Sequence, residues 1–327
     1  MRALVTGATG CVGANIVEAL LRGGYEVRAM RRKTSRLTAL DGLEAELVIG
    51  DVLDEASLRR AMEGCDLVFH AAGISQYWRN DPRLIYRVNV EGTRRVLQAA
   101  MASGVERLIY TSSAATLGLP TRPGEMLDEQ HPFNIPPDLF PYAHSKHLAE
   151  KAVREAIAQG LDAVIVNPVA VIGQRDIGFV GGEILRTVKR GLGLVAPPGG
   201  MGVVSAYATG LGHRLAAERG RTGERYLLNG ENLSHRRLME ITAAIVGGRA
   251  PLLTLPKAAI PPLAWLAKQV NRLRYDAPLV DETQLRLSAC DLRFDAGKAQ
   301  RELGFPPHNA EGAVREAWLW YRLHDLL

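Results

Sequence analysis

The amino-acid sequence predicts an α/β fold in which helices cover both faces of a parallel sheet. Two observations carry this prediction. Short apolar runs alternate with segments of helical spacing through the first half of the chain. A glycine-rich turn, Thr6–Gly13, joins the first apolar run to the first helical segment. After Pro168 glycine and proline become frequent and the alternation fades, which indicates a second, smaller domain.

Each element of the first half follows from its composition and its flanks. The predicted strands are short and mostly apolar, as buried parallel strands should be. They are Ala3–Val5, Glu26–Met30, Ala45–Ile49, Leu67–Phe69, Leu108–Tyr110 and Ala163–Val166. The predicted helices are Cys11–Arg22, Glu55–Glu63, Pro82–Ser103 and Tyr142–Gln159. We expect Asp54 to cap the second helix and Gly104 to end the third.

The division into domains is predicted at residue 168. Residues 1–168 form the first domain and residues 169–327 mainly form the second. Glu224–Leu228 is expected to be a strand that returns to the first sheet. Helices are predicted at Leu233–Gly247, Pro261–Arg274 and Ala310–Leu323.

Composition excludes several classes of protein. The chain has 327 residues, 47% hydrophobic and 23% charged, with a formal net charge of +5. Its basic residues are scattered among acidic ones, which argues against a nucleic-acid partner. Cys11, Cys65 and Cys290 are far apart, so no disulfide framework is expected. With a strand starting near Arg2 and no apolar run of about 20 residues, we expect no signal peptide, no membrane span and a cytoplasmic location.

The turn Thr6–Gly13 predicts a dinucleotide site. Gly7 permits the tight turn, Gly10 lets the backbone approach a pyrophosphate, and Gly13 allows the helix to pack on the strand. The spacing is GxxGxxG, and an ordinary β–α turn is the alternative. The position between strand and helix favours a doubly wound Rossmann domain that binds NAD(P).

The end of the second strand favours NADP. An NAD-selective site usually has an acidic residue there, and none lies between Val27 and Leu40. Arg31, Arg32 and Lys33 place positive charge where a 2′-phosphate would lie. If these are only solvated surface charges, NAD is the alternative.

Two further strand ends carry residues of interest. Asp51 follows the third strand, where it either accepts from the adenine amino group or caps the turn. Small residues, Ala71, Ala72 and Gly73, follow the fourth strand and let the chain lie against the cofactor. We interpret His70, just before them, as a packed, hydrogen-bonded histidine rather than a catalytic one.

Tyr142 and Lys146 form the predicted catalytic pair. At i and i+4 they share one face of a helix. An ammonium about 4 Å from a phenolate would stabilise it by about 4 kcal/mol, which lowers the tyrosine pKa by about three. Ser113, at the carboxyl end of the fifth strand, is placed to hydrogen-bond a substrate oxygen while Tyr142 moves a proton. The alternative is a capping serine and a surface pair.

Together these motifs resemble the extended short-chain dehydrogenase/reductases of the NAD-dependent epimerase/dehydratase type. The resemblance covers the whole chain and is nearest to dihydroflavonol-4-reductase-like and hopanoid-associated sugar epimerase-like proteins. It implies that Tyr142 is the acid/base, Lys146 its partner and Ser113 the active-site hydroxyl. Asn89 would be a structural or proton-relay residue. The cofactor residues expected from motif and resemblance are Gly7, Thr9, Gly10, Cys11, Val12, Gly13, Arg31, Arg32, Asp51, Val52, Ala71, Ala72, Gly73, Asn89, Thr111, Ser112, Tyr142, Lys146, Asn167, Pro168 and Val169.

The chain departs from the family pattern at two places. Thr111-Ser112-Ser113 stands where many nucleotide-sugar dehydratases have Thr-Asp-Glu, which argues against acid-assisted loss of water. Ser205–Ala208 stands where members often have a His-Val-Asp-Asp segment, so substrate contacts there are in doubt.

The resulting expectation is an NADP-dependent oxidoreductase acting on a carbonyl or secondary alcohol. The alternative is a nucleotide-sugar epimerase with a retained cofactor, for which Arg175, Arg186 and Arg190 are candidate pyrophosphate contacts. A minor alternative is a cofactor-binding regulator without turnover. The resemblance also implies a homodimer through the helices at 82–103 and 142–159.

Three further features each allow a structural and a functional interpretation. His144 and His147 do not suffice for a metal site, and we expect none; His144 would face the substrate mouth instead. Glu129 either touches substrate or is a solvated loop charge. The segment Pro256–Arg274 is interpreted as a lid over the substrate pocket, with a basic amphipathic helix at a membrane surface as the less favoured alternative.

Overall fold

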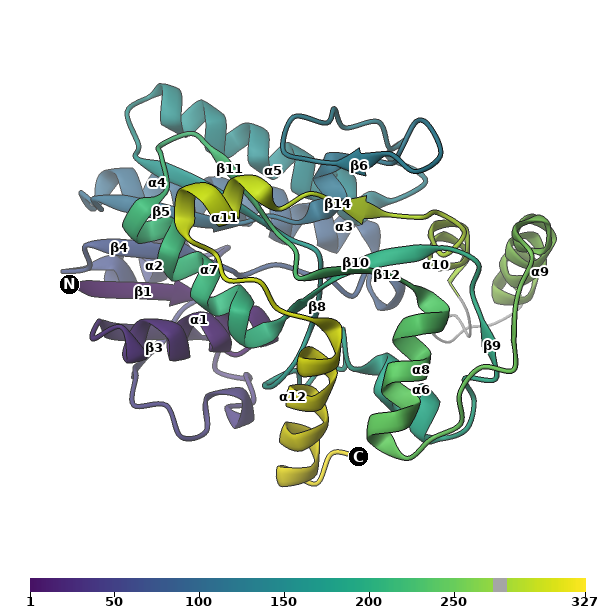
Figure 1. Ribbon diagram of the computed structural model, residues 1–327. Coiled ribbons are helices and arrows are strands. Elements are labelled where there is room, and N and C mark those ends of the chain that lie inside the picture. The colour runs from purple at the N-terminus through teal and green to yellow at the C-terminus, as the bar shows by residue number, and fades with distance from the viewer. Residues whose placement is uncertain (273–280) are drawn as a thin grey trace.

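The main layer of the molecule is a seven-stranded parallel sheet (Figure 1). The computed structural model describes residues 1–272 and 281–327. The strand order is β3-β2-β1-β4-β5-β7-β11, the doubly wound order with its switch between β1 and β4, so the predicted fold class is confirmed. The strands are β1 (Arg2–Thr6), β2 (Glu26–Arg31), β3 (Glu46–Ile49), β4 (Leu67–His70), β5 (Arg107–Thr111), β7 (Ala163–Pro168) and β11 (Arg225–Leu228).

Helices cover both faces of this sheet, because successive strand residues point to opposite sides. In β1, Ala3 and Val5 enter the apolar cluster under one set of helices, and Leu4 enters the cluster under the other. The first face carries α1 (Cys11–Arg22) and α7 (Ala206–Arg219), and α11 (Gly297–Leu303) packs on α7 and β11. The second face carries α2 (Glu55–Met62), α4 (Thr93–Ala102) and α5 (Pro141–Ala158).

The predicted helix Pro82–Ser103 has three parts. It begins as α3 (Pro82–Tyr86), passes through a π-helical turn (Arg87–Gly92) and continues as α4. The predicted ends hold: Gly104 adopts a φ of +66° just after α4. The predicted cap of α2 is also confirmed, since Asp54 Oδ1 accepts from the N–H groups of Ala56 and Ser57.

A smaller unit lies beside the carboxyl ends of the strands. Its sheet has the order β12-β10-β8, and three helices pack around a separate apolar cluster. Two short parallel pairs, β9 with β13 and β6 with β14, complete it. The division at residue 168 stays a prediction, since α7 and β11 come later in the chain and pack on the main sheet. The bounds are β6 (Met126–Leu127), β8 (Ala170–Ile172), α6 (Glu183–Lys189), β9 (Val195–Ala196), β10 (Gly200–Ser205), β12 (Glu231–Ser234), α8 (His235–Val246), β13 (Leu253–Thr254), β14 (Arg293–Phe294) and α12 (Ala310–Leu323).

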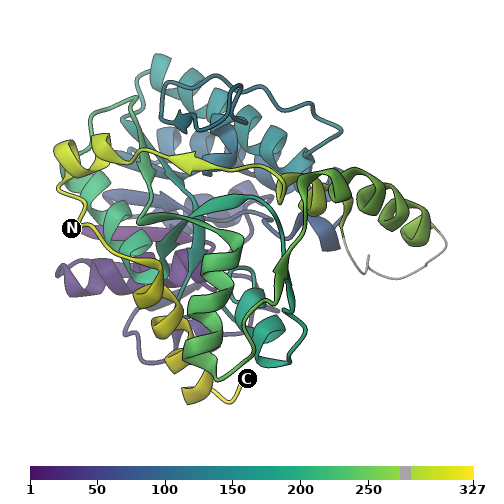
Figure 2. The ribbon, with the colours of Figure 1, turned by 45° about the vertical axis from the view of Figure 1, so that its right-hand side comes forward.

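Helix α9 (Ile260–Arg272) stands out from the body of the molecule (Figure 2). It packs against α10 (Glu282–Leu287) and the preceding 3-10 turn, Lys257–Ala259. The helix predicted at 261–274 is confirmed as far as residue 272, and its last two residues lie outside the described part. The favoured prediction of a lid needs correction, because α9 projects rather than lying packed over the body. No helix in the described ranges is long and apolar enough to cross a bilayer.

Candidate active site

The glycine turn between β1 and α1 is shaped for close approach. Gly7 has a φ of +69°, and a Cβ there would lie 2.6 Å from the Ala72 Cα. A Cβ on Gly13 would lie 2.1 Å from the Gly7 carbonyl oxygen. At Gly10, by contrast, a Cβ would meet only that oxygen, at 3.4 Å. Gly7 and Gly13 therefore pack the turn, and Gly10 faces open space.

The N-terminus of α1 lacks side-chain partners of its own. Gly10 is the N-cap, no side chain caps the helix, and its first turn contains no acidic residue. The first backbone bond runs from Ala14 N–H to Gly10 O over 2.9 Å. The N–H groups of Cys11, Val12 and Gly13 are thus offered to an anion, with the helix dipole in support. Together with the half-buried Thr9, they fit a dinucleotide pyrophosphate.

The end of β2 carries positively charged side chains that are only partly hydrogen-bonded. The Nε of Arg31 is buried and has no hydrogen-bond partner in the described part of the chain. The Arg31 Nη1 donates only weakly, to the Arg32 carbonyl oxygen at 3.4 Å. Arg32 itself is exposed. An orphaned guanidinium nitrogen beside the glycine turn fits a bound phosphate.

Asp51 has the capping role that the sequence allowed. Its Oδ1 accepts from Leu53 N–H at 2.9 Å, and its N–H donates to Ser57 Oγ at 3.0 Å. Val52 is buried and packs on Gly92, where a Cβ would lie 2.9 Å from the Val52 Cγ2. Contact of Asp51 and Val52 with adenine stays a prediction.

His70 is a packed histidine, as predicted. It is fully buried at the end of β4, with Nδ1 2.8 Å from Thr6 Oγ1 and Nε2 3.0 Å from Thr93 Oγ1. Burial, and then the Lys146 charge, lower the pKa of His70 to about 3. The ring is therefore neutral and structural.

Asn89 lies in the π-helical turn and ties two segments of the site together. Its Oδ1 accepts from Ile74 N–H at 2.8 Å, and its Nδ2 donates to Ile74 O at 3.1 Å and Ser145 Oγ at 3.0 Å. Ser145 donates in turn to the Tyr142 carbonyl oxygen at 2.7 Å. Single π turns of this kind often occur at functional sites. Asn89 therefore fixes the loop that follows Ala71, Ala72 and Gly73 against the start of α5.

Gly73 lies between Asn89 and Lys146. A Cβ there would be 3.1 Å from Asn89 Oδ1 and 3.5 Å from Lys146 Nζ. The predicted cofactor residues Gly73, Asn89 and Lys146 are thus brought together by the fold.

Ser113 and Tyr142 meet across the carboxyl end of β5. Ser113 caps a short 3-10 turn, Ala114–Leu117, with Oγ accepting from Ala115 N–H at 3.2 Å. Tyr142 is in the first turn of α5. Burial raises the pKa of the Tyr142 phenol, and a hydrogen bond from Ser113 partly offsets that rise. The predicted pair of serine and tyrosine is present.

Lys146 lies on α5 one turn after Tyr142, as predicted, and its amine is hydrogen-bonded at the end of β5. Its Nζ donates to Thr111 O at 2.7 Å and to Tyr110 Oη at 3.4 Å, because the side chain extends toward β5. Burial lowers the Lys146 pKa to about 8, and Glu150 opposes this shift. Burial raises the pKa of the Tyr142 phenol in this arrangement, and the lowering expected from a nearby ammonium stays a prediction.

Glu150, which the sequence analysis did not single out, is the centre of a buried network behind the site. Its Oε1 accepts from Ser112 Oγ at 2.5 Å, Thr116 Oγ1 at 2.8 Å and Asn167 Nδ2 at 2.7 Å. Its Oε2 is 3.3 Å from Arg225 Nε. Glu150 could have been found from the sequence, because it lies four residues after Lys146 and so shares its helix face.

The hydroxyls of Thr111 and Ser112 are already engaged. Thr111 Oγ1 is 2.9 Å from His213 Nε2, and Ser112 bonds to Glu150. Any contact of these two residues with a cofactor would be through the backbone. Their cofactor role stays a prediction.

Asn167 and Pro168 end β7, and Val169 follows them, all inside the molecule. Asn167 Nδ2 also donates to Ser113 O at 3.1 Å, so it positions the backbone of the site serine. Pro168 and Val169 are buried, and Val169 N–H donates to Leu228 O at 3.1 Å. Their place beside the nicotinamide stays a prediction.

An aromatic wall adjoins Tyr142, and the sequence analysis missed it. The Tyr77 ring is stacked with that of Tyr142 at 6.1 Å, and it meets Phe140 edge-on at 4.7 Å. Tyr77 lies in a 3-10 turn (Tyr77–Arg79), and Phe140 comes directly before α5. The spacing of residues in the sequence does not reveal that these two segments approach each other. The cluster that forms this aromatic wall comprises Tyr77, Ala115, Leu119, Phe133, Ile135, Leu139, Phe140, Tyr142, Ala143 and Leu287.

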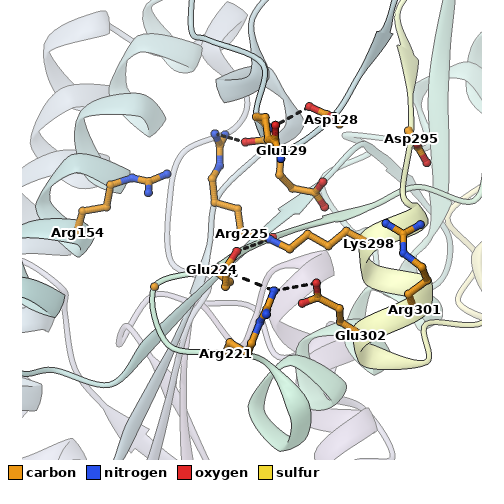
Figure 3. Close-up of a pocket in the computed structure, with 12 residues that line it drawn as sticks. Asp128, Glu129, Arg154, Arg221, Glu224, Arg225, Asp295, Lys298, Arg301 and Glu302 are labelled. Atoms are coloured by element: carbon orange, nitrogen blue, oxygen red, sulfur yellow. Dashed lines mark hydrogen bonds and ion pairs between the residues drawn. The ribbon is translucent and has the colours of Figure 1, made fainter.

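Glu129 lies at the edge strand, away from these residues. Its Oε1 accepts from Leu227 N–H at 2.8 Å, which fastens its loop to β11. Figure 3 shows it in a polar pocket where Arg225, Lys298 and Glu224 also meet. Glu129 therefore anchors its loop and is not a freely solvated charge, while its contact with substrate stays a prediction.

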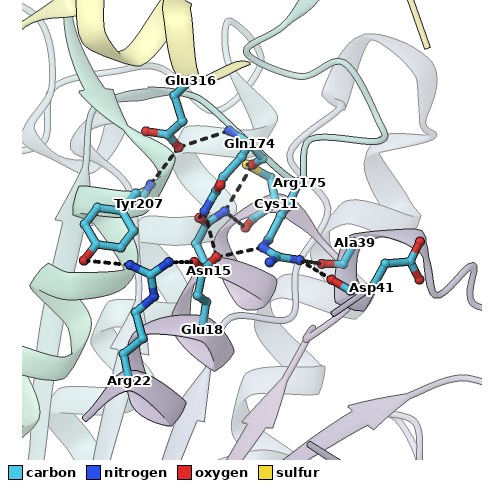
Figure 4. A network of polar contacts seen from close by, with 10 residues as sticks. All are labelled: Cys11, Asn15, Glu18, Arg22, Ala39, Asp41, Gln174, Arg175, Tyr207 and Glu316. Carbon is cyan, nitrogen blue, oxygen red and sulfur yellow. Dashed lines mark hydrogen bonds and ion pairs between the residues drawn. The ribbon is translucent and has the colours of Figure 1, made fainter. Parts of the chain in front are cut away.

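The arginines considered for a nucleotide-sugar pyrophosphate are largely committed elsewhere. Arg175 Nε donates to Glu18 at 2.9 Å, and its Nη1 donates to Ala39 O at 2.7 Å (Figure 4). Arg186 pairs with Glu183 and lies over the Phe179 ring. Arg190 is exposed on the surface.

A carboxylate from another part of the chain lies beside the segment Ser205–Ala208, which has no acidic residue of its own. Ser205 Oγ caps α7 by accepting from Ala208 N–H at 3.0 Å. Glu316, from α12, accepts from Tyr207 N–H at 3.2 Å and Gln174 N–H at 3.1 Å (Figure 4). A residue distant in sequence thus supplies negative charge at this point.

The two histidines of α5 serve packing. His144 Nδ1 is 2.8 Å from Tyr86 Oη, and the His147 ring stacks on Phe133 at 4.4 Å. Within residues 1–272 and 281–327, no three histidine, cysteine or acidic side chains are grouped as metal ligands would be.

The model of the NAD dependent epimerase/dehydratase family matches residues 3–193. The chain belongs to this family. A Synechocystis sp. protein named "Putative dihydroflavonol 4-reductase" is 36% identical, over 98% of this chain and 94% of its own length. Sterol demethylase protein B of Methylococcus capsulatus is 34% identical, over 100% of both chains.

Among solved structures, similarity extends to an epimerase. A nucleoside-diphosphate-sugar epimerase from Pseudomonas aeruginosa has a TM-score of 0.82 and 28% identity, covering 100% of this chain and 99% of its own. The resemblance to the extended short-chain dehydrogenases is confirmed, and the chain is an NAD(P)-dependent enzyme of the reductase and epimerase kind.

Proposed function

We propose that the chain is an NADP-dependent reductase of a hydrophobic ketone or aldehyde, able to run the reverse oxidation. The observation that carries this proposal is the aromatic wall beside Tyr142. Rings and aliphatic side chains favour an apolar substrate, whereas a nucleotide sugar needs polar partners. The commitment of Arg175 and Arg186 to carboxylates supports the same choice.

The residues of this chain divide the work of reduction. When bound, the cofactor supplies the hydride that reduces the carbonyl carbon. Ser113 donates a hydrogen bond to the carbonyl oxygen and orients it. Tyr142 gives its phenolic proton to that oxygen, so the carbonyl becomes an alcohol: the C=O π bond is lost, the C–O single bond stays, and one C–H and one O–H bond form. Lys146 holds a positive charge nearby, and Asn89 fixes the backbone of Tyr142 through Ser145.

The test is a screen of carbonyl compounds, from small soluble ketones to polycyclic ones, by loss of NADPH absorbance. Tyr142→Phe should lower turnover by about 100-fold or more while the NADPH dissociation constant stays the same. Tyr86→Phe is the matched control, since its hydroxyl bonds only to His144 in the described structure. Equal turnover in Tyr142→Phe and the native enzyme would refute the mechanism.

NADP is proposed over NAD from Arg31 and Arg32. The double variant Arg31→Ser/Arg32→Ser should lower the preference for NADPH over NADH by about tenfold, because it removes two charges that would meet a 2′-phosphate. Ratios of kcat/KM for the two cofactors measure this effect. An unchanged ratio would mean that these arginines do not select the cofactor.

The nucleotide-sugar epimerase remains the second candidate, favoured by the likeness to the Pseudomonas epimerase. An epimerase would keep its cofactor through purification and interconvert sugars without added NADPH, whereas a reductase would exchange it freely. A regulator would bind NADPH with no turnover on either class of substrate. The homodimer through α3–α4 and α5 and the cytoplasmic location also stay proposals; light scattering and fractionation test them.

A further inference from the structure

Helix α9 presents large apolar side chains to solvent. The exposed fractions are 61% for Trp265, 52% for Leu266, 39% for Val270 and 38% for Leu263. We call these four residues the apolar ridge. A soluble surface rarely groups such side chains without a partner.

The ridge follows from helix geometry. Leu263, Leu266 and Val270 are spaced i, i+3 and i+7, so they form one stripe, and Trp265 flanks it. The opposite side of the helix is buried: Ile260 is 2% and Ala264 is 0% exposed. The ridge is therefore the exposed face of α9, a helix that also packs against α10.

The stretch of sequence that contains α9 carries basic residues and no acidic ones. Between Glu240 and Asp276 the sequence contains no acidic residue. Its basic residues are Arg249, Lys257, Lys268, Arg272 and Arg274. Arg249 and Lys257 are exposed, and Lys268 pairs with Glu282 of α10 at 3.2 Å while staying half exposed.

The basic residues favour one of the two partners that could cover the ridge, a second copy of the chain or a lipid surface. A symmetric contact with a second copy through the ridge would bring like charges of the two copies together, among them Lys257 and the half-exposed Lys268. An anionic lipid surface accepts the apolar side chains and attracts the basic ones, with lysine stems extending to the headgroups.

The ridge is also joined to the candidate active site. Thr283 of α10 donates to Leu139 O at 2.9 Å, and Gln284 hydrogen-bonds Tyr77. Leu287, at the end of α10, packs in the aromatic wall with Tyr142. The pair α9–α10 thus has an exposed apolar side at one end and the wall of the site at the other.

We infer that α9 docks the enzyme on an anionic membrane surface, through which a membrane-dissolved carbonyl substrate reaches the aromatic wall. The docking does not depend on the reaction, but the naming of the substrate class rests on the proposed function. The contact is peripheral, since the ridge lies on one side of a short amphipathic helix.

Vesicle flotation tests the docking with the full-length protein. It should float with vesicles of equal parts phosphatidylglycerol and phosphatidylcholine, and much less with phosphatidylcholine alone. The variant Leu263→Ser/Leu266→Ser/Val270→Ser should bind at least about tenfold more weakly. The matched control, Leu319→Ser/Leu323→Ser, removes leucines that are 63% and 80% exposed on α12 and should bind like the native protein.

A second measurement separates the charge from the apolar contact. Lys257→Gln should weaken binding to the anionic vesicles only, and added salt should do the same. No flotation of the native protein, or equal flotation of the ridge variant, would overturn the docking. A mass of two chains that the ridge variant reduces to one would overturn it in favour of self-association.

Activity on two kinds of substrate keeps the docking and the reaction apart. The ridge variant should reduce a small soluble ketone at the native rate and lose activity on a carbonyl compound embedded in the vesicles. Flotation without activity on any carbonyl would refute the proposed function and leave the docking. Equal activity of both proteins on the embedded compound would refute the delivery role.

Discussion

Two regions meet at Tyr142, and their side chains are held in different ways. On the cofactor side, Asn89 and Glu150 are buried on helices and hydrogen-bonded to several partners. On the side proposed for the substrate, Tyr77 and Phe140 come from irregular segments and contact each other through their rings, with one hydrogen bond, from Gln284 to Tyr77. The first region is therefore specified residue by residue, while the second tolerates change of shape. This difference predicts large effects of substitution on one side and small effects on the other.

The largest effect is expected at Glu150. Glu150→Gln should destabilise the fold by about 3 kcal/mol, because it leaves the buried Arg225 guanidinium without its carboxylate. Urea unfolding measures this change. Glu155→Gln, at an exposed position of the same helix, is the control and should stay within about 0.5 kcal/mol of the native protein. Equal stability of the two variants would contradict the view that the region around Glu150 is specified residue by residue.

Lys146 should give the next largest effect, as a pH dependence of stability. Its pKa is about 8 in the folded protein against an ordinary value of 10.5, so the unfolded chain binds more protons between these pH values. Stability should therefore rise with pH across this window, by at most about 3 kcal/mol. Comparing unfolding of the native protein and Lys146→Met at several pH values isolates this contribution. The same slope in both proteins would show that Lys146 titrates normally.

The smallest effect is expected in the aromatic wall. Phe140→Leu keeps the site apolar and should raise KM for a hydrophobic carbonyl by about threefold to tenfold, through lost contact area. Its kcat on a small soluble ketone should not change. Steady-state kinetics on the two substrates give this comparison. A fall in kcat on both substrates would mean that the wall, too, holds the catalytic residues in place.

The sequence could predict the cofactor side because regular elements place its residues. The glycine turn, Ser113 and Tyr142 all lie at strand ends or on one helix turn, where spacing fixes position. The direction of the Lys146 side chain was not predictable, because it depends on Thr111 O and Tyr110, which belong to a strand far away in the sequence. The wall was missed for the same reason, since Tyr77 and Leu287 meet only through the tertiary fold.

The outward face of α9 was visible in the sequence as a stripe, yet periodicity could not say what covers it. A buried lid and an exposed ridge give the same spacing of leucines. Only the burial of Ile260 and Ala264 in the folded protein shows which side of the helix is covered.

The π-helical turn at Arg87–Gly92 gives the long helix one residue more than an α-helical path requires. The two halves of the helix are therefore out of phase by about 100°. Deleting one residue in this turn would leave a regular helix but rotate Asn89 away from Ile74 and Ser145. The site thus depends on the number of residues in the helix as well as on their kinds. A related sequence could therefore keep every catalytic side chain and still be inactive if it had gained or lost one residue in this turn.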